Sequence, residues 1–339
     1  MYALKTSENQ KVDEVAASAL APESLRLCRR YQDHLFDQPV LESEVAQIGR
    51  GAPRYVSEQI RGRDMRLVRL RFAPKAVTQV VMDPDWILLL LPLALRGRYV
   101  FNGLEARSFD LFISAGRDGC ATFGEHRDTL SVGLRRARFE AACRALAGGS
   151  IDCIALSDQR LPLGADEVGW LRHRFLTAID AARSMPTVAG SQVLSEVVEN
   201  DLITDIAAVL APHTLRGPPR EPARCDALRV VRAARRAIDA RRARPPSLAD
   251  LCAAAGVGQT WLHRCFVEVC GTSPVHYLRA SRLSMARDRL LDPQSRSVKD
   301  AALQLGFLHS GRFAADYSAM FGESPKETLL SRPDGQATP

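Results

Sequence analysis

The sequence predicts an α+β protein: an N-terminal β-sandwich or barrel with trailing helices, then an all-α domain of two helix-turn-helix units joined by a long helix. Three observations predict this fold. Short segments rich in β-branched and aromatic residues follow one another from about residue 54 to residue 134, with no helical segment between them. Apolar residues then recur with the 3.6-residue period of a helix. Near the C-terminus, one block of sequence occurs twice, at residues 247–278 and 297–329.

Gly, Pro, Asp or Asn mark many junctions between the β segments. We expect strands at residues 54–60, 65–72, 76–82, 85–95, 98–104, 108–115, 120–124 and 129–134. We expect helices at residues 135–149, 165–183 and 193–211. The most apolar segment, residues 86–97, is short, contains a proline and ends in charge, so no membrane span is expected.

The length of 339 residues is large for one hydrophobic core. A segment rich in Pro, Gly and Arg, from Pro212 to Arg224, interrupts both periodicities. The sequence therefore predicts one domain over residues 1–211, a linker over 212–225 and a second domain over 226–330.

Both copies of the repeated block begin with the same local signals. Each has a serine that can cap a helix, an aspartate three residues later and a glycine at the expected turn. These residues are Ser247, Asp250 and Gly256 in the first copy, and Ser297, Asp300 and Gly306 in the second. Each copy thus predicts two short helices joined by a sharp turn.

In the second helix of the first copy, the apolar residues form one stripe, and the opposite face carries Thr260, His263, Arg264 and Val267. That is the face a recognition helix presents to base edges. A single copy could instead be an ordinary helical pair with a solvated polar face, but the duplication argues against this alternative.

Several motifs in this region match a known family. They are the L-x-R-x-F of Leu262 to Phe266, the YLRASRL of Tyr277 to Leu283, Gly306-Phe307 and the FGESP of Phe321 to Pro325. From about residue 226 to 330, the chain resembles the double helix-turn-helix domain of AraC/XylS-family transcription regulators. The resemblance implies two recognition helices joined by a central helix, expected at residues 275–291 and ~25 Å long at about 1.5 Å per residue.

The N-terminal half more weakly resembles the cupin-like sensor and dimerisation half of many family members. This resemblance rests on the order of the elements, a barrel followed by helices. It implies a small-molecule effector of unknown identity and unknown binding residues. We also expect a homodimer contact through at least one of the helices at 165–183 and 193–211, because paired sites need paired proteins.

We expect Thr260, His263 and Arg264 to face base edges, with the planar fork of Arg264 suited to guanine. The remaining expected DNA-binding residues are Gln259, Trp261, His309, Ser310 and Arg312. The outward positions of the second recognition helix hold only short side chains: Gly311, Ala314, Ala315 and Ser318. The second copy is therefore expected to contact the DNA backbone and to depend on DNA shape more than to read bases.

The charge distribution fits a nucleic-acid partner. The chain has a net charge of +7, and residues from Arg216 onward hold 20 Arg and Lys against 12 Asp and Glu. Basic charge steers a protein toward phosphate. A cluster of arginines precedes the first copy, and a solvated Arg-rich helix is the alternative for it: Arg229, Arg232, Arg235, Arg236, Arg241, Arg242 and Arg244.

No catalytic or metal site is predicted, and no cofactor is expected. His34, His126, His173 and His213 are isolated, whereas a metal cupin needs several converging histidines. The strand arginines could line a pocket for an acidic or polar effector, but exposed alternating positions are favoured for them: Arg63, Arg66, Arg69 and Arg71. Eight cysteines without a C-x-x-C pair, and an N-terminus without a secretion signal, favour a reducing cytoplasm.

The sequence therefore predicts a cytoplasmic transcription regulator that is not an enzyme. Its expected partners are double-stranded DNA, a small-molecule effector and, for an activator, RNA polymerase. The effector, the target promoters and the choice between activation and repression are left open. A cupin-type enzyme fused to a nucleic-acid-binding domain and a purely architectural DNA binder are the alternatives.

Overall fold

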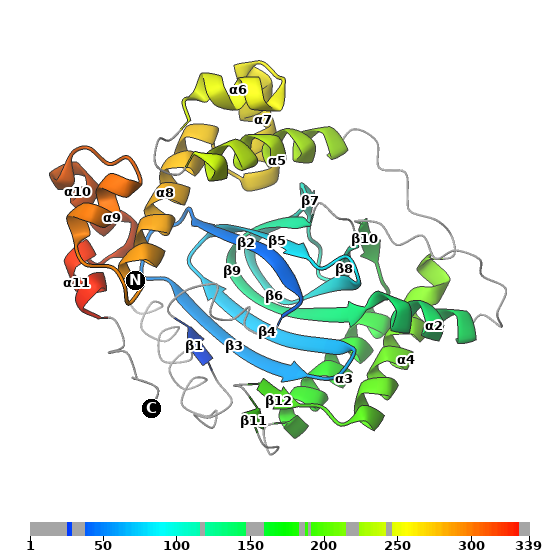
Figure 1. Ribbon diagram of the computed structural model, residues 1–339. Coiled ribbons are helices and arrows are strands. Elements are labelled where there is room, and N and C mark those ends of the chain that lie inside the picture. Colours follow the sequence, from blue (N-terminus) through cyan, green and yellow to red (C-terminus); the bar gives the residue numbers. More distant parts are fainter. Residues whose placement is uncertain are drawn as a thin grey trace, which may run out of the picture.

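The computed structural model combines an N-terminal β-sheet, flanked by helices, with a group of C-terminal helices (Figure 1). This confirms the mixed α and β composition and the order of the two halves. The structure describes residues 26–28, 38–115, 119–146, 159–182, 187–188, 191–214, 224–241 and 246–331.

The sheet contains short strands and two long ones. The strands are β1 (Arg26–Cys28), β2 (Val40–Gln47), β3 (Arg54–Arg61), β4 (Met65–Ala73), β5 (Ala76–Met82), β6 (Trp86–Phe101), β7 (Leu104–Glu105), β8 (Asp110–Ser114), β9 (Cys120–Arg135), β10 (Gln159–Pro162), β11 (Thr187–Val188) and β12 (Ser191–Val193). Strands β1, β2, β10, β11 and β12 were not among the expected strands.

Two pairs of expected strands are in fact single strands. Residues 85–95 and 98–104 belong mostly to β6, and residues 120–124 and 129–134 belong to β9. Gly97 has a φ of 84°, and the pairing of β6 with β9 shifts register between Arg96 and Tyr99. The glycine therefore marks a β-bulge inside a strand, where the sequence suggested a turn.

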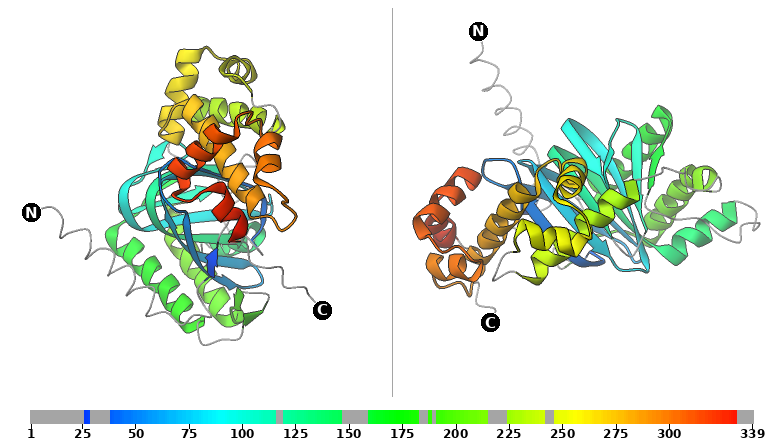
Figure 2. Two further views of the ribbon diagram at one scale, coloured as in Figure 1. Left: turned by 90° about the vertical axis from the view of Figure 1, so that its left-hand side faces the viewer. Right: turned by 90° about the horizontal axis from the view of Figure 1, so that it is seen from above.

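The sheet curls because β6 and β9 pair with each other over most of their length and with different strands at their two ends. Strand β4 pairs with the C-terminal part of β9, and β5 pairs with its N-terminal part. Strands β3 and β2 continue these two sides. Residues from β4, β5, β6 and β9 consequently line one common interior. Figure 2 shows the curled sheet from two further directions.

Three helices cover one outer face of the curled sheet: α2 (Arg136–Leu146), α3 (Ala165–Ala182) and α4 (Glu196–Thr214). The outward-facing Ile87, Leu89 and Leu91 of β6 pack into the same core as these helices, whereas Leu88 and Leu90 face the interior. Burial on both faces explains the continuous apolar run of β6. Among the described residues, no helix is long and apolar enough to cross a membrane.

All three predicted helices of this region are present, with ends shifted by a few residues. Helix α4 continues through Pro212 to Thr214, and α5 (Arg224–Ala240) begins at Arg224. The helices thus extend into both ends of the predicted linker over 212–225. The rest of that segment, residues 215–223, lies outside the described residues.

The C-terminal helices occur where the repeat predicted them. After α5 come α6 (Leu248–Ala255), α7 (Gln259–Cys270), α8 (Pro274–Leu290), α9 (Val298–Gln304), α10 (Ser310–Phe321) and α11 (Pro325–Leu330). The expected central helix at 275–291 is α8, displaced by one residue at each end. Ser273 caps α8, and Pro274 occupies its first turn, where a missing N–H costs nothing.

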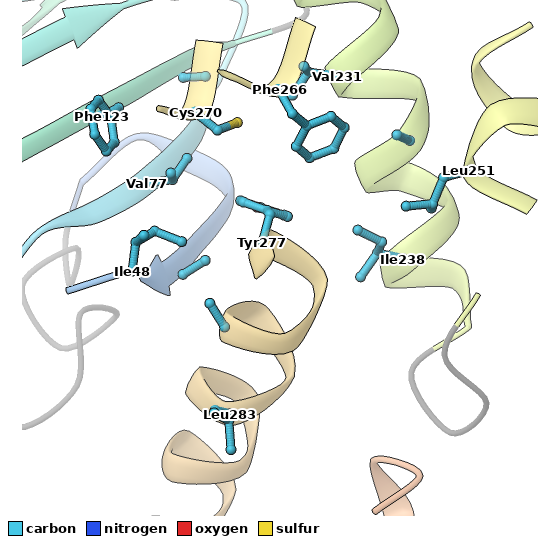
Figure 3. Packing of buried hydrophobic residues seen from close by; sticks show 14 of the residues in the cluster. Ile48, Val77, Phe123, Val231, Ile238, Leu251, Phe266, Cys270, Tyr277 and Leu283 are labelled. Atoms are coloured by element: carbon cyan, nitrogen blue, oxygen red, sulfur yellow. The ribbon is translucent and has the colours of Figure 1, made fainter. Parts of the chain in front are cut away.

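The C-terminal helices share a hydrophobic core with the sheet (Figure 3). Val77 and Phe123 of the sheet, Val231 of α5 and Tyr277 of α8 are all buried in it. The sheet is therefore covered by α2, α3 and α4 on one side and by the C-terminal helices on another.

Candidate nucleic-acid interface

Helices α6 and α7 meet at a sharp turn whose ends are locally stabilised. The Ser247 hydroxyl accepts a hydrogen bond from the Asp250 N–H, and the Asp250 carboxylate accepts one from the Ser247 N–H at 2.8 Å, which forms a capping box. The Ser247 hydroxyl also donates to the Asp250 carboxylate at 2.7 Å, and this bond, together with the one from the Ser247 N–H, holds the pKa of Asp250 below its ordinary value. Gly256 ends α6 with a φ of 66°, a left-handed conformation that glycine adopts without strain.

Helix α7 buries one face and exposes the other. Leu262, Cys265 and Phe266 are at most 1% exposed. The five residues of α7 that the sequence singled out as DNA contacts are all exposed: Gln259, Thr260, Trp261, His263 and Arg264. The guanidinium of Arg264 lies over the indole ring of Trp261, 5.6 Å from the ring centroid. The two side chains therefore form one exposed unit near the start of α7.

Helix α10 has the same arrangement with different side chains. Phe313, Tyr317 and Phe321 are buried and pack against one another. His309, Ser310 and Arg312 are exposed at the start of the helix. Between them, Gly311 faces open space, because a Cβ placed there would have no atom within 4 Å.

A groove of 440 Å³ lies beside the start of α10, between α8 and the turn that precedes α10. Its lining includes His309 and Arg312, and the guanidinium of Arg282 stacks on Phe307 at 4.3 Å. Leu308 is 80% exposed beside it. The groove adjoins the residues that the sequence assigned to the second DNA contact.

The arginines before α6 have divergent surroundings. Arg235 is only 2% exposed and donates to the Glu44 carboxylate of β2 at 2.7 Å, and Arg232 donates to the Gly119 carbonyl. Arg229 and Arg241 form exposed ion pairs with Asp226 and Asp250. Arg242 and Arg244 lie outside the described residues.

The expectation that this whole cluster faces either phosphate or solvent is wrong for two of its members, because Arg232 and Arg235 point toward the sheet. The spacing of apolar residues along a helix reveals which residues share a face. It does not reveal that a sheet carrying a carboxylate lies against that face.

The interior of the curled sheet contains a cavity of roughly 60 Å³. Its lining is mostly aliphatic, with one polar end around Arg127, Thr78 and Thr122. Arg127 is 6% exposed and donates to both threonine hydroxyls, at 3.2 and 2.8 Å. Burial raises the pKa of the adjacent Tyr99 to about 12, although Arg127 acts against this shift, so the phenol stays protonated at neutral pH.

The sequence missed Arg127. It lies in the E-H-R-D segment of residues 125–128, between two expected strands, and only the continuity of β9 turns its side chain inward. The strand arginines that the sequence singled out do not line the cavity: Arg63, Arg66, Arg69 and Arg71. Arg69, for example, pairs with Asp128 at 2.8 Å.

The histidines do not converge. His126 and His173 are exposed, and His213 lies 3.3 Å from a carboxylate oxygen of Glu167. His34 lies outside the described residues. Within the described part of the chain, no group of three or more His, Cys, Asp or Glu side chains could hold a metal ion.

Comparison with known proteins identifies the C-terminal helices. A family described as "Helix-turn-helix domain" matches residues 251–331. The chain is 45% identical over 73 residues to the "XylDLEGF operon transcriptional activator 1" of Pseudomonas putida, which covers 21% of this chain and 22% of that protein. It is 38% identical over 106 residues to the "Probable thc operon regulatory protein" of Rhodococcus erythropolis, covering 31% of this chain and 32% of that protein.

A solved structure of similar sequence matches about a third of this chain. A transcriptional regulator with an AraC-type DNA-binding domain from Chromobacterium violaceum is 28% identical, with a TM-score of 0.30, and covers 32% of this chain and 95% of that chain. The curated relatives thus match over only a fifth to a third of their own length. Their names describe an operon transcriptional activator and a probable operon regulatory protein.

The capped α6, the glycine turn and the exposed polar face of α7 match what a major-groove helix requires. Gly256 and the whole of α7 fall inside the matched region, whereas the capping residues Ser247 and Asp250 precede it. Residues 251–331 of this chain therefore match a helix-turn-helix domain, and the chain is similar over this part of its length to transcription regulators such as the XylDLEGF operon activator.

Proposed function

We propose that this protein is a sequence-specific DNA-binding transcription regulator with two helix-turn-helix units, α6–α7 and α9–α10, whose activity is set by a small molecule bound inside a cupin-like barrel. One observation carries the DNA-binding part. Each unit has a second helix that begins just after a sharp turn, buries an apolar stripe and leaves its first turn exposed. Helix starts with this exposure can enter the major groove.

The first unit is the one that reads bases. Thr260, His263 and Arg264 supply hydrogen-bonding groups of three kinds on one exposed face. Stacking on Trp261 holds the Arg264 fork near the start of α7, and a planar fork can donate two bonds to guanine. Gln259 and Trp261 flank this face and suit the groove edge.

The second unit contacts the phosphate backbone of DNA rather than the bases. The short side chains of Gly311 and Ala315 let the backbone of α10 approach DNA closely, but they offer no bonds to bases. His309, Ser310 and Arg312 surround the free N–H groups at the start of α10, a combination that favours phosphate. Phosphate contacts position a protein without carrying sequence information.

The small molecule would enter the cavity of the curled sheet. Aliphatic side chains such as Leu70, Val80 and Leu90 suit an apolar body. Arg127 and the protonated Tyr99 can donate hydrogen bonds to a polar end. A small molecule with an apolar body and one hydrogen-bond-accepting end fits this arrangement.

Selection from a random DNA pool with the full chain, followed by a base-by-base affinity scan, tests the DNA-binding proposal. We expect an enriched motif with its strongest base preferences over one half-site. A pool that yields no motif at physiological salt, with binding that depends only on ionic strength, would instead identify an architectural DNA binder.

A thermal-shift screen of small carboxylates and amides against the full chain tests the effector proposal. A hit should shift Tm in the wild type and fail to do so in Arg127→Met, which keeps the bulk but removes the donors. Hits that shift both proteins equally would locate the small molecule elsewhere.

Homodimerisation and contact with RNA polymerase also belong to the proposal. The apolar stripes of α3 and α4 pack on the sheet and are not free for a second copy. The remaining apolar exposure on these helices includes Trp170, which is 41% exposed, and Val197, which is 71% exposed. Sedimentation of the full chain at tens of micromolar, with and without DNA, checks the dimer.

A further inference from the structure

One side of the curled sheet is a single layer with the cavity on one face and the C-terminal helices on the other. We call this layer, made of β2, β5, the N-terminal part of β9 and the C-terminal part of β6, the shared wall. Its cross-strand register makes the alternation explicit. Ala46, Val77, Phe123 and Val100 form one row, and all four belong to the core shared with the C-terminal helices.

The adjacent row across the same strands contains Val45, Thr78, Thr122 and Phe101. Because successive side chains of a strand point to opposite faces, this row faces inward. Thr78 and Thr122 line the cavity and share a hydrogen bond. Only a single layer of β-strands therefore separates a molecule in the cavity from the C-terminal helices.

A polar cluster, in which Arg235 is buried and Glu44 is partly exposed, joins the wall to these helices. The Glu44 carboxylate of β2 accepts from Arg235 of α5 at 2.7 Å and from the Ser281 hydroxyl of α8 at 2.8 Å. Burial alone would lower the pKa of Arg235, but the charge of Glu44 outweighs it and raises the pKa. The Gln47 N–H of β2 also donates to the Ser284 hydroxyl of α8 at 3.0 Å.

The contact is also tightly packed. A Cβ atom at Gly271, which ends α7, would overlap the ring of Phe123. Cys270 lies beside it, fully buried, and Figure 3 shows its side chain in the same cluster as Phe123, Val77 and Tyr277. Because these side chains are close-packed, a displacement of the shared wall must also displace the C-terminal helices.

We propose that filling the cavity loosens the contact between the shared wall and the C-terminal helices, with Glu44, Arg235 and Ser281 as the latch that holds the contact when the cavity is unfilled. The cavity is roughly 60 Å³, so an occupant that exceeds this space and lies wholly inside the curled sheet pushes the surrounding strands outward. On the shared wall that push acts directly on α5, α7 and α8. This inference rests on the proposed function only for the identity of the occupant, and its test needs neither effector nor DNA.

Cys270 supplies the readout, because its thiol is accessible only when the contact opens. The measurement is the rate at which N-ethylmaleimide modifies Cys270 in the full chain, followed by peptide mass spectrometry. Thr78→Leu adds bulk on the shared wall, and Thr129→Leu adds the same bulk on the part of β9 backed by α2, α3 and α4. Both threonines line the cavity and are 3% and 4% exposed.

We expect Thr78→Leu to raise the modification rate of Cys270 at least about tenfold, the change that corresponds to 1.4 kcal/mol in an opening equilibrium. Thr129→Leu, and Thr78→Val as the control for the lost hydroxyl, should stay within about twofold of the wild type. Equal effects of the two leucine variants, or none from Thr78→Leu, would overturn the coupling. Val80→Phe replaces Thr78→Leu should that variant not fold by circular dichroism.

The latch is tested separately. Glu44→Gln leaves the Arg235 charge buried without its counter-ion, and we expect at least about tenfold faster modification of Cys270. The double variant Glu44→Gln/Arg235→Met should restore protection, because no unpaired charge remains. If Cys270 reacts no faster in Glu44→Gln than in the wild type, the three polar residues do not hold the contact closed. If Cys270 reacts faster in both the single and the double variant, the cause is lost packing.

Discussion

The α6–α7 and α9–α10 pairs have the same backbone plan and different outward surfaces. Their buried positions correspond in size and character, since Phe266 and Tyr317 are both fully buried aromatic residues fifty-one positions apart. Their outward positions do not correspond: Thr260, Trp261, His263 and Arg264 of α7 stand where α10 has Gly311, Arg312, Ala314 and Ala315. Packing constrains the inner face of such a unit, and the DNA that it meets constrains the outer face.

The largest expected effect tests the equivalence of the two cores. Phe266→Ala and Phe313→Ala each remove a ring that is at most 1% exposed, so each should cost ~3–5 kcal/mol of stability. Hydrogen exchange of the amides in α7 and α10 measures the loss in each pair separately. The exposed Val267→Ala is the control and should stay within about 0.5 kcal/mol of the wild type. A large difference between the two phenylalanine variants would mean that the pairs are not energetically equivalent.

The next largest effect is expected on DNA binding by the exposed face of α7. Arg264→Ala should weaken binding to the selected DNA site by ~1–3 kcal/mol and relax preference at one base pair. Arg264→Lys should restore little, because an ammonium lacks the planar fork. Competition binding against a panel of single-base variants measures both. An equal loss for every sequence would show that Arg264 contacts phosphate.

A weaker and less selective effect is expected at the corresponding surface of α10. Arg312→Ala should lower affinity for all sequences alike and reduce the slope of log affinity against log salt by about one. Titrations at several salt concentrations measure the slope, with Lys326→Ala as a control for the loss of an exposed positive charge in the same domain. Base-dependent losses in Arg312→Ala would contradict the division of labour between the two pairs.

The smallest effect concerns the helix starts. Ser247 and Asp250 form a reciprocal capping box, whereas the Ser297 hydroxyl accepts from the Asp300 N–H without the reciprocal bond. Ser247→Ala and Ser297→Ala remove the same hydroxyl bonds, because the additional bond of α6 is donated by the Ser247 backbone, so each should destabilise its helix by ~1 kcal/mol. Exchange rates of the amides in the first turns of α6 and α9 compare the two. The threonine variants at both positions should stay close to the wild type.

The sequence alone determined every feature that depends on local chemistry. The serine caps, the left-handed glycines at 256 and 306 and the apolar stripe of α7 follow from spacing and residue type, and the structure contains all of them. The exposure of the eight expected DNA-contact residues also follows, because a helix that buries Leu262 and Phe266 must turn its other face outward. What these residues bind remains a prediction.

Only the tertiary structure decided the features that depend on distant partners. In the sequence, nothing distinguishes Arg235 from the neighbouring arginines. In the structure, it donates to Glu44, which is nearly two hundred residues away in the sequence. Gly97 suggested a turn, but pairing with β9 makes it a bulge within one strand. The same long strand turns Arg127 into the cavity. The local periodicity of the sequence determines which side chains share a face. Strand pairing and domain packing determine which residues cover that face, and no local pattern encodes them.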